Sequence, residues 1–330
     1  MRANDRRGFA MKIGMVSDSL GHLPLEKMLA TAARMGVQGI EFNAANWTSA
    51  PHFNNKKVLE DVAARKYLQT AMKSSGLELV ALNANGNQLH PTEGDKQSGD
   101  LHDTIRAAGE LGVKTVVLMS GLPAGSKLDK MPNWIVSSWP PETQTILKYQ
   151  WEDVALPYWH KLARFAKEHG VTKLAVEMHG NQLVFNVPTL LRLRKEIGPI
   201  VGANLDPSHL MWMGADAHAA IDVLGSAIYN IHAKDTFINK PVCATTSRLE
   251  NGSLMDIPAR AWSYITLGYG NGESWWRDFC YRLRMVGYDG WLNIEHEDVM
   301  LNRIEGVQKS VDFLKTVVPA EAGDYKPQEF

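Results

Sequence analysis

The sequence predicts a single (β/α)8 TIM barrel, and three observations indicate this fold class. Eight short apolar runs recur along the 330 residues, and each is followed by a segment whose apolar residues have helical spacing. The alternative, a doubly wound open sheet, is expected to carry a G-x-G-x-x-G turn after its first strand, but the turn here reads SDSLGH. Two overlong connections, 121–146 and 235–272, follow the fourth and seventh runs, at the barrel end that carries active sites.

The apolar runs have the length of strands, and the segments between them have the length of helices. The predicted strands span residues 12–16, 39–43, 78–85, 115–120, 173–179, 201–206, 227–234 and 290–297. The predicted helices span residues 23–35, 58–76, 100–112, 154–170, 187–198, 217–225, 275–287 and 303–317. Pro24 stands near the first helix start, where proline is tolerated, and the second and third predicted helices end in glycine.

Composition and charge narrow the class of protein. Hydrophobic residues make up 45% and charged residues 22% of the chain, and the net charge of −1 does not favour binding to nucleic acid or an anionic membrane. Two cysteines without metal-type spacing, and a charged first segment without the apolar core of a signal peptide, favour a cytoplasmic protein. We expect an extension over residues 1–11, one catalytic barrel over 12–317 and a tail over 318–330.

Polar side chains follow the predicted strands at the points where the strands end. Glu177 and His179 stand two residues apart after a buried run, so both side chains point to one face. The other strand ends supply Glu41, Asn43, Asn83, Asn85, Asp206, His232, Lys234, Glu295 and Glu297. Converging carboxylates repel one another unless a cation lies among them. The sequence therefore predicts a divalent metal at Glu177, with Asp206, His232 and Glu295 on the neighbouring strands.

The donor types indicate which metal to expect. Three carboxylates and one imidazole form an oxygen-rich set that suits Mn²⁺ best, with Mg²⁺ or Co²⁺ as alternatives. Zn²⁺ is less favoured, because structural zinc sites use thiolates and none is placed here. A metal with open coordination positions polarises a carbonyl and its neighbouring hydroxyl, while carboxylates, His179 or His209 move protons.

The segments VEMH, NLDPSH, NIHAKD and NIEHED together resemble the xylose isomerase-like TIM-barrel superfamily, over Lys12 to about Val317. This superfamily includes sugar phosphate isomerases and epimerases, ketose 3-epimerases and endonuclease IV. The resemblance implies that Glu177, Asp206, His232 and Glu295 are metal ligands. It also implies that His209 lines the substrate site and that Glu177 and Glu295 serve as the acid/base pair.

Two departures from the superfamily pattern are informative. Ketose 3-epimerases carry an arginine a few residues after the ligand histidine, whereas this chain reads HAKDTF, with Lys234 and Asp235. Endonuclease IV holds three zinc ions with extra histidines on early strands, where this chain offers Asn43, Asn83 and Asn85. The departures argue against a free-ketose 3-epimerase and a DNA-repair enzyme.

A narrower resemblance points to a second reaction. The segments VEMHGN, LGYGNGESWWRDF (267–279) and VGYDGWLNIEHED (286–298) look like those of C-glycoside deglycosidases and related enzymes, which act on 3-oxo-glycosides. The resemblance implies that His179 is the base, that the aglycone leaves by β-elimination and that a small partner subunit is present. The leading interpretation is a metal-dependent sugar isomerase or epimerase, and the alternative is this lyase.

Further residues are candidates for contacts with a sugar or glycoside substrate. Lys234 shares the His232 face, although lysines at such positions are often surface charges. Asn83 and Asn85 can bind sugar hydroxyls or serve only as turn residues. Trp47, like Trp134, Trp139 and Trp212, lies in or near one of the predicted loops that follow the strands. Such rings stack on sugars, pack long loops or form the interface of a homo-oligomer.

Overall fold

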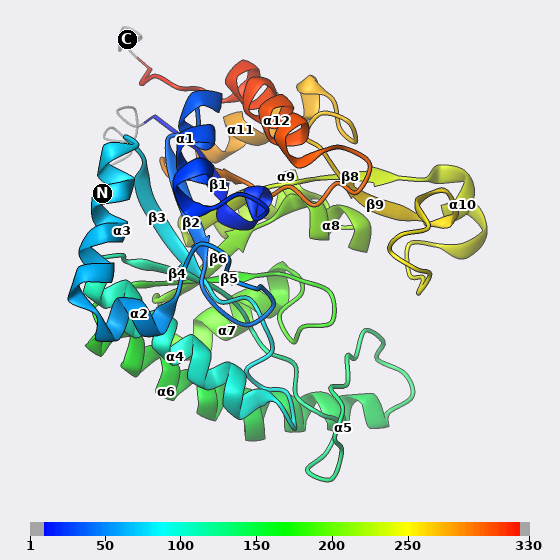
Figure 1. Cartoon of the computed structure of the whole chain (residues 1–330). Coiled ribbons are helices and arrows are strands. Elements are labelled where there is room, and N and C mark those ends of the chain that lie inside the picture. Colours follow the sequence, from blue (N-terminus) through cyan, green and yellow to red (C-terminus); the bar gives the residue numbers. More distant parts are fainter. Residues whose placement is uncertain (1–9, 324–330) are drawn as a thin grey trace, which may run out of the picture.

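The computed structural model describes residues 10–323, and it confirms the predicted barrel. Eight parallel strands close in the order β1-β10-β7-β6-β5-β4-β3-β2, surrounded by helices (Figure 1). Their bounds are β1 Lys12–Val16, β2 Gly39–Asn43, β3 Glu78–Asn83, β4 Thr115–Met119, β5 Lys173–Glu177, β6 Val201–Leu205, β7 Ile228–Ala233 and β10 Trp291–Ile294. All eight predicted strands are present, several of them one to four residues shorter than predicted.

The predicted helices are also present. Their bounds are α1 Leu25–Met35, α2 Asn55–Glu60, α3 Val62–Ser74, α4 Gly94–Leu111, α6 Leu156–Glu168, α7 Val187–Ile197, α9 Ala217–Leu224, α11 Glu273–Met285 and α12 Arg303–Val317. The predicted helix 58–76 is interrupted at Asp61, whose side chain accepts hydrogen bonds from two amides of α3 and so starts a new helix. None of the described helices is long and apolar enough to cross a membrane.

The two long connections contain structure of their own. The first includes α5 Glu142–Lys148, which continues through a π-helical segment, Tyr149–Ala155, into α6. The second contains α10 Lys240–Thr246 between β8 Asp235–Ile238 and β9 Trp262–Ile265, which pair antiparallel. A short helix, α8 Pro207–Met213, directly follows β6. Both excursions project from the same end of the barrel in Figure 1, so they flank whatever lies at that end.

The barrel interior is layered along its axis. Ala81, Val117 and Ala175 form a small apolar cluster inside the strands. Next to this cluster lies a buried polar layer from β2, β3, β6, β7 and β10, which comprises Glu41, Asn83, Asn204, Asn230 and Asn293. Side chains alternate along a strand, so the next residue that points inward lies two positions further toward the carboxyl end. For β6, β7 and β10 that residue is also polar. This alternation brings the predicted site residues to one end of the barrel.

The predicted domain boundaries are not tested by this structure. Residues 1–9 of the expected extension and 324–330 of the expected tail lie outside the described residues. Met11, which was assigned to the extension, is buried in the core just before β1.

Candidate metal centre

Three buried side chains from adjacent strands meet at the carboxyl end of the barrel. Glu177 ends β5, Asp206 directly follows β6 and His232 lies in β7, and one donor atom of each lies within 4.8 Å of the others. Glu295 directly follows β10, and its Oε2 lies 3.3 Å from His232 Nδ1. The structure thus brings together all four residues that the sequence analysis assigned to the metal.

Glu177 is held as a carboxylate by a set of hydrogen bonds. Asn204 Nδ2 donates to its Oε2 over 2.8 Å, and Asn85 Nδ2 donates to the same oxygen over 3.0 Å. Burial would raise the pKa of Glu177, but hydrogen bonds from His209 and His232 hold that pKa well below its usual range. The buried charge is therefore compensated by donors from four neighbouring segments.

Asp206 divides its two oxygens between two tasks. Its Oδ1 accepts from the Ser208 amide over 2.8 Å and so caps α8, which helps to place His209 beside the site. Its Oδ2 is buried and lies 3.1 Å from Lys234 Nζ and 3.2 Å from His209 Nε2, but it accepts no hydrogen bond of good geometry among the described residues. Local capping therefore orients the second oxygen toward the cluster.

His232 has the same arrangement, with one ring nitrogen engaged and one left over. Its Nε2 lies 2.8 Å from Glu41 Oε1, and because a carboxylate only accepts, Nε2 carries the hydrogen. Its Nδ1 lies 3.1 Å from Glu177 Oε2 but, like Asp206 Oδ2, lacks a partner of hydrogen-bond geometry among residues 10–323. Burial would lower the pKa of His232, but the charges of Glu41 and Glu295 raise it well above its usual value. A proton or a metal at Nδ1 satisfies the same need for positive charge.

Lys234 supplies a second positive charge to the cluster. Its Nζ lies 3.1 Å from Asp206 Oδ2, 2.6 Å from Glu295 Oε2 and 2.9 Å from Glu297 Oε2, and the side chain is 3% exposed. Burial would lower the pKa of Lys234, but these three carboxylates raise it well above its usual value. Burial alone would raise the pKa of Glu295, but the positive charges of Lys234 and His232 lower that pKa to about 2. Lys234 was predicted as a substrate contact; it lies among these carboxylates, and the substrate contact stays a prediction.

These observations answer whether the residues fit a divalent cation. Asp206 Oδ2 and His232 Nδ1, which make charged contacts but no hydrogen bond of good geometry, belong to the same cluster as Glu177, whose Oε2 faces His232. Carboxylate and imidazole donors suit Mn²⁺, Mg²⁺ or Zn²⁺, and the cluster lies at the end of a barrel where open coordination positions face the loops. The donor set therefore fits a divalent metal.

His209 and Tyr264 extend the cluster toward the loops. His209 Nε2 lies 3.0 Å from Glu177 Oε1, and the Tyr264 hydroxyl lies 2.9 Å from His209 Nδ1. Because Nε2 donates to the carboxylate, the neutral ring accepts the tyrosine hydrogen at Nδ1. Tyr264 was not singled out from the sequence, because its strand, β9, lies inside a segment that was expected to be a loop. Only the antiparallel pairing of β9 with β8 brings it back over the site.

His179 is a neutral imidazole beside this chain of hydrogen bonds. Its Nδ1 lies 2.5 Å from the carbonyl oxygen of Gly180, so Nδ1 carries the hydrogen and Nε2 carries the lone pair. Burial, followed by the nearby His209, lowers the pKa of His179 to about 3. The ring centroids of His179 and His209 lie 4.1 Å apart. The ring is therefore neutral at neutral pH, with an unprotonated Nε2.

The remaining predicted contacts take different places. Asn83 is buried and donates to Glu41 Oε1 over 2.8 Å, while Asn85 donates to Glu177 as described above. Both amides therefore support carboxylates of the site. Trp47 is 53% exposed, with its ring edge toward His179 at a centroid distance of 6.3 Å. Of the residues predicted to contact substrate, Trp47 and His209 are placed beside the neutral histidine.

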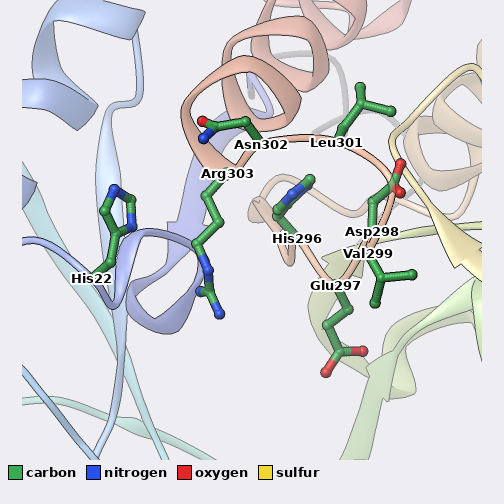
Figure 2. Close-up of a pocket in the computed structure, with 8 residues that line it drawn as sticks. All are labelled: His22, His296, Glu297, Asp298, Val299, Leu301, Asn302 and Arg303. Atoms are coloured by element: carbon green, nitrogen blue, oxygen red, sulfur yellow. The ribbon is translucent and has the colours of Figure 1, made fainter. Parts of the chain in front are cut away.

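Two hollows adjoin the cluster on different sides. A cavity of 800 Å³ lies under the excursions that follow β4 and β7, and His179 and Tyr264 belong to its lining. A second hollow of 540 Å³ lies beside Glu297, where Figure 2 shows Arg303, His22 and His296 around it. Arg303 was not noticed in the sequence because it follows the last strand by several residues, at the start of α12.

Comparison with known proteins places the chain in a family. The profile described as Xylose isomerase-like TIM barrel matches residues 29–317. A relative described as uncharacterized protein YfiH of Bacillus subtilis (strain 168) is 46% identical over 311 residues, which are 93% of this chain and 99% of that protein. Both results are consistent with the barrel and with the motifs on its strands.

Solved structures with the same fold share little sequence. The IOLI protein with a bound zinc atom superposes with a TM-score of 0.66 at 17% identity, covering 93% of this chain and 98% of that one. The 3-keto-D-glucoside 4-epimerase YcjR from E. coli superposes with a TM-score of 0.62 at 13% identity, covering 93% of this chain and 99% of that one. These matches support the fold, and the profile and the YfiH relative carry the assignment. The chain belongs to the xylose isomerase-like TIM-barrel family.

Proposed function

We propose that this protein is a divalent-metal-dependent sugar isomerase or epimerase that moves a proton on a carbon next to a carbonyl. One observation carries the proposal: donor atoms of Glu177, Asp206 and His232 lie within 4.8 Å of one another, and Asp206 Oδ2 and His232 Nδ1 make charged contacts there without a hydrogen bond of good geometry. Burying such a cluster is costly, and a metal ion bound by these atoms together offsets that cost.

The metal would be held by Glu177, Asp206, His232 and Glu295. The three oxygen-donor residues favour Mn²⁺, with Mg²⁺ or Co²⁺ as alternatives and Zn²⁺ less favoured. When bound, a divalent cation supplies the Lewis acidity that polarises a sugar carbonyl and the hydroxyl beside it.

The protein's own groups would move the proton. Glu177 and Glu295 are carboxylates at neutral pH on β5 and β10, which lie on opposite sides of His232 in the barrel order. A carboxylate on either side of a sugar carbon can remove a proton from one face and return it to the other. Asn204 and Asn85 hold Glu177 in place, and Lys234 holds Glu295 through its 2.6 Å contact.

The alternative is a lyase that cleaves 3-oxo-glycosides by β-elimination. One observation favours it, namely that neutral His179 borders the 800 Å³ cavity, which has room for a leaving group. YcjR, which is described as a 3-keto-D-glucoside 4-epimerase, supports testing oxidised glucosides under both proposals. A homo-oligomer, or a small partner subunit in the lyase case, stays a prediction.

Proton NMR in D₂O tests the two reactions. The protein loaded with Mg²⁺, which is diamagnetic and does not broaden proton signals, is incubated with free ketoses, sugar phosphates and 3-oxo-glucosides. Deuterium entering next to the carbonyl, with a new sugar isomer, is the expected result for the isomerase or epimerase. Release of the aglycone from a 3-oxo-glucoside would establish the lyase instead, and neither change with any substrate would refute both.

The variants Glu177→Gln and Glu295→Gln test the site itself. Each removes a charge and an oxygen donor, so we expect both to lose Mn²⁺ binding and activity together. The matched control is Glu78→Gln, because Glu78 is exposed at the opposite end of β3 and pairs only with Lys12. Tight Mn²⁺ binding in both site variants would refute the proposed ligand set.

A further inference from the structure

We propose that the 800 Å³ cavity is a subsite for a second, uncharged ring, so that the substrate is a glycoside rather than a free monosaccharide. This inference rests on the proposed function, because it places the reacting sugar at the metal cluster and the second ring beyond His179. The lining of the cavity includes Trp134, Val136, His179, Trp212, Trp262 and Tyr264.

The cavity is continuous with the catalytic cluster through two shared residues. His179 borders the cavity and lies 4.1 Å, between ring centroids, from His209. Tyr264 lines the cavity with its ring while its hydroxyl bonds to His209 Nδ1 over 2.9 Å. Any substituent that leaves a sugar ring on this side must therefore enter the cavity.

The size of the cavity exceeds what one sugar ring needs. A volume of 800 Å³ lies in the upper part of the range of pockets that hold drug-sized ligands, about 300–1,000 Å³. A single hexose is smaller than such ligands. The cavity therefore has room for a second ring beside the reacting sugar.

The aromatic walls are fixed by packing. Trp212 stacks on Trp262 with centroids 4.7 Å apart and an interplanar angle of 9°. Gly180 permits this position, because a Cβ at residue 180 would lie 2.5 Å from the Trp212 ring. The Nε1 atoms of Trp212 and Trp134 are buried without a hydrogen-bond partner in the part of the chain that the structure describes. Flat faces with spare N–H donors suit a ring that carries oxygen substituents.

The charges in the cavity are already engaged, which favours an uncharged occupant. Arg260 pairs with Glu250 over 3.1 Å and lies over the Trp262 ring, 4.6 Å from its centroid. Arg248 donates to the carbonyl oxygen of Met211. Arg303, at the hollow of Figure 2, likewise donates to the carbonyl oxygen of Asp18, so engaged guanidinium groups border both hollows. The aromatic walls therefore distinguish the cavity of 800 Å³ from that hollow, and they favour an uncharged ring.

The test compares binding of unreactive ligands, so it does not depend on turnover. Calorimetry with the Mn²⁺-loaded protein measures affinity for phenyl β-D-glucopyranoside, methyl β-D-glucopyranoside and glucose 6-phosphate. We expect the phenyl glucoside to bind at least tenfold more tightly than the methyl glucoside. Trp134→Ala should remove at least fivefold of this preference and change the affinity for the methyl glucoside less than twofold.

Two further variants keep the result interpretable. Val136→Trp narrows the cavity from a position that is 51% exposed, so it tests the subsite if Trp134→Ala does not fold. Trp139→Ala is the matched control, because Trp139 is in the same loop, is 74% exposed and is not part of the cavity lining. The first variant should lose the preference for the phenyl glucoside, and the control should keep it.

The outcomes separate the subsite from the proposed function. Equal binding of phenyl and methyl glucosides by the wild type, or equal weakening of both by Trp134→Ala, would overturn the subsite. Tighter binding of glucose 6-phosphate that Arg303→Met abolishes would overturn it in favour of a phosphorylated substrate. A phenyl preference that depends on Trp134, together with no reaction on any oxo-sugar, would support the subsite and refute the proposed function.

Discussion

Glu41 connects the buried polar layer of the barrel to the metal centre, and its replacement by glutamine is the most informative single change. The side chain is fully buried on β2 and accepts four hydrogen bonds. His232 Nε2 and Asn83 Nδ2 donate to Oε1, each over 2.8 Å, and Asn230 and Asn293 donate to Oε2 over 2.8 and 3.0 Å. Glutamine has the same shape, but one end of its amide is a donor.

The size of the effect follows from this geometry. Either orientation of the glutamine amide places an NH₂ group against two N–H donors, so two hydrogen bonds to a charged acceptor are lost. At about 1.5–3 kcal/mol each, the expected loss in free energy of unfolding is about 3–6 kcal/mol. This agrees with the roughly 3–5 kcal/mol measured when one partner of a buried ion pair is removed.

The same change should weaken the metal site through His232. Glu41 fixes the hydrogen on Nε2 and leaves Nδ1 facing Glu177 and Glu295. Loss of such a supporting carboxylate costs about 10- to 100-fold in metal affinity, or about 1.4–2.7 kcal/mol. We expect Glu41→Gln to show this loss for Mn²⁺ by calorimetry and to unfold at lower urea concentration.

The control for this experiment is again Glu78→Gln, which should change the free energy of unfolding by no more than about 0.5 kcal/mol because Glu78 is exposed. A folded Glu41→Gln protein that binds Mn²⁺ as tightly as the wild type would refute the reasoning about His232. Unchanged urea stability would refute the reasoning about the buried hydrogen bonds.

Three further predictions follow from neighbouring contacts. Tyr264→Phe removes the hydrogen bond to His209 Nδ1, which is worth about 1 kcal/mol. In steady-state assays kcat/KM should therefore fall about fivefold, while the affinity for Mn²⁺ changes less than twofold. An equal fall in kcat/KM and in Mn²⁺ affinity would contradict this prediction. Gly180→Ala places a methyl group 2.5 Å from the Trp212 ring, so calorimetry should show weaker binding of the phenyl glucoside. Thermal unfolding should show that the free energy of unfolding falls by about 1–3 kcal/mol. A fully stable variant with normal binding would contradict this prediction. The pKa of His179 is about 3 in the folded protein and 6.5 in the unfolded chain, so between these values the unfolded chain binds the extra proton. The free energy of unfolding therefore falls as the pH drops from 6.5 toward 3, by up to about 1.4 kcal/mol per pH unit. His179→Gln should flatten this slope in urea unfolding between pH 7 and 5, and equal slopes for the variant and the wild type would show that His179 does not cause it.

Much of the fold was predictable because local patterns encode it. The eight strands were identified from short apolar runs, and the helices between them from helical spacing and glycine stops. The segment 235–272 was harder, because β8 and β9 are four residues long and stabilise each other only as a pair. The helix break at Asp61 was missed because an aspartate inside an apolar pattern does not by itself identify a helix cap.

The sequence by itself determined which residues reach the metal centre. A period of two along each parallel strand places Glu177, Asp206, His232 and Glu295 at one end of the barrel, whatever the details of packing. That conclusion needs only the strand boundaries and the rule that the carboxyl ends of barrel strands lie together.

Only the tertiary structure decided what those residues contact. Glu41 and His232 are 191 positions apart and lie on strands that are not neighbours, so their pairing depends on closure of the barrel. Lys234 binds three carboxylates, and Tyr264 reaches His209 only because β9 folds back on β8. Spacing along the chain fixes the face on which a side chain points, but the atoms that meet across the barrel are fixed by long-range packing.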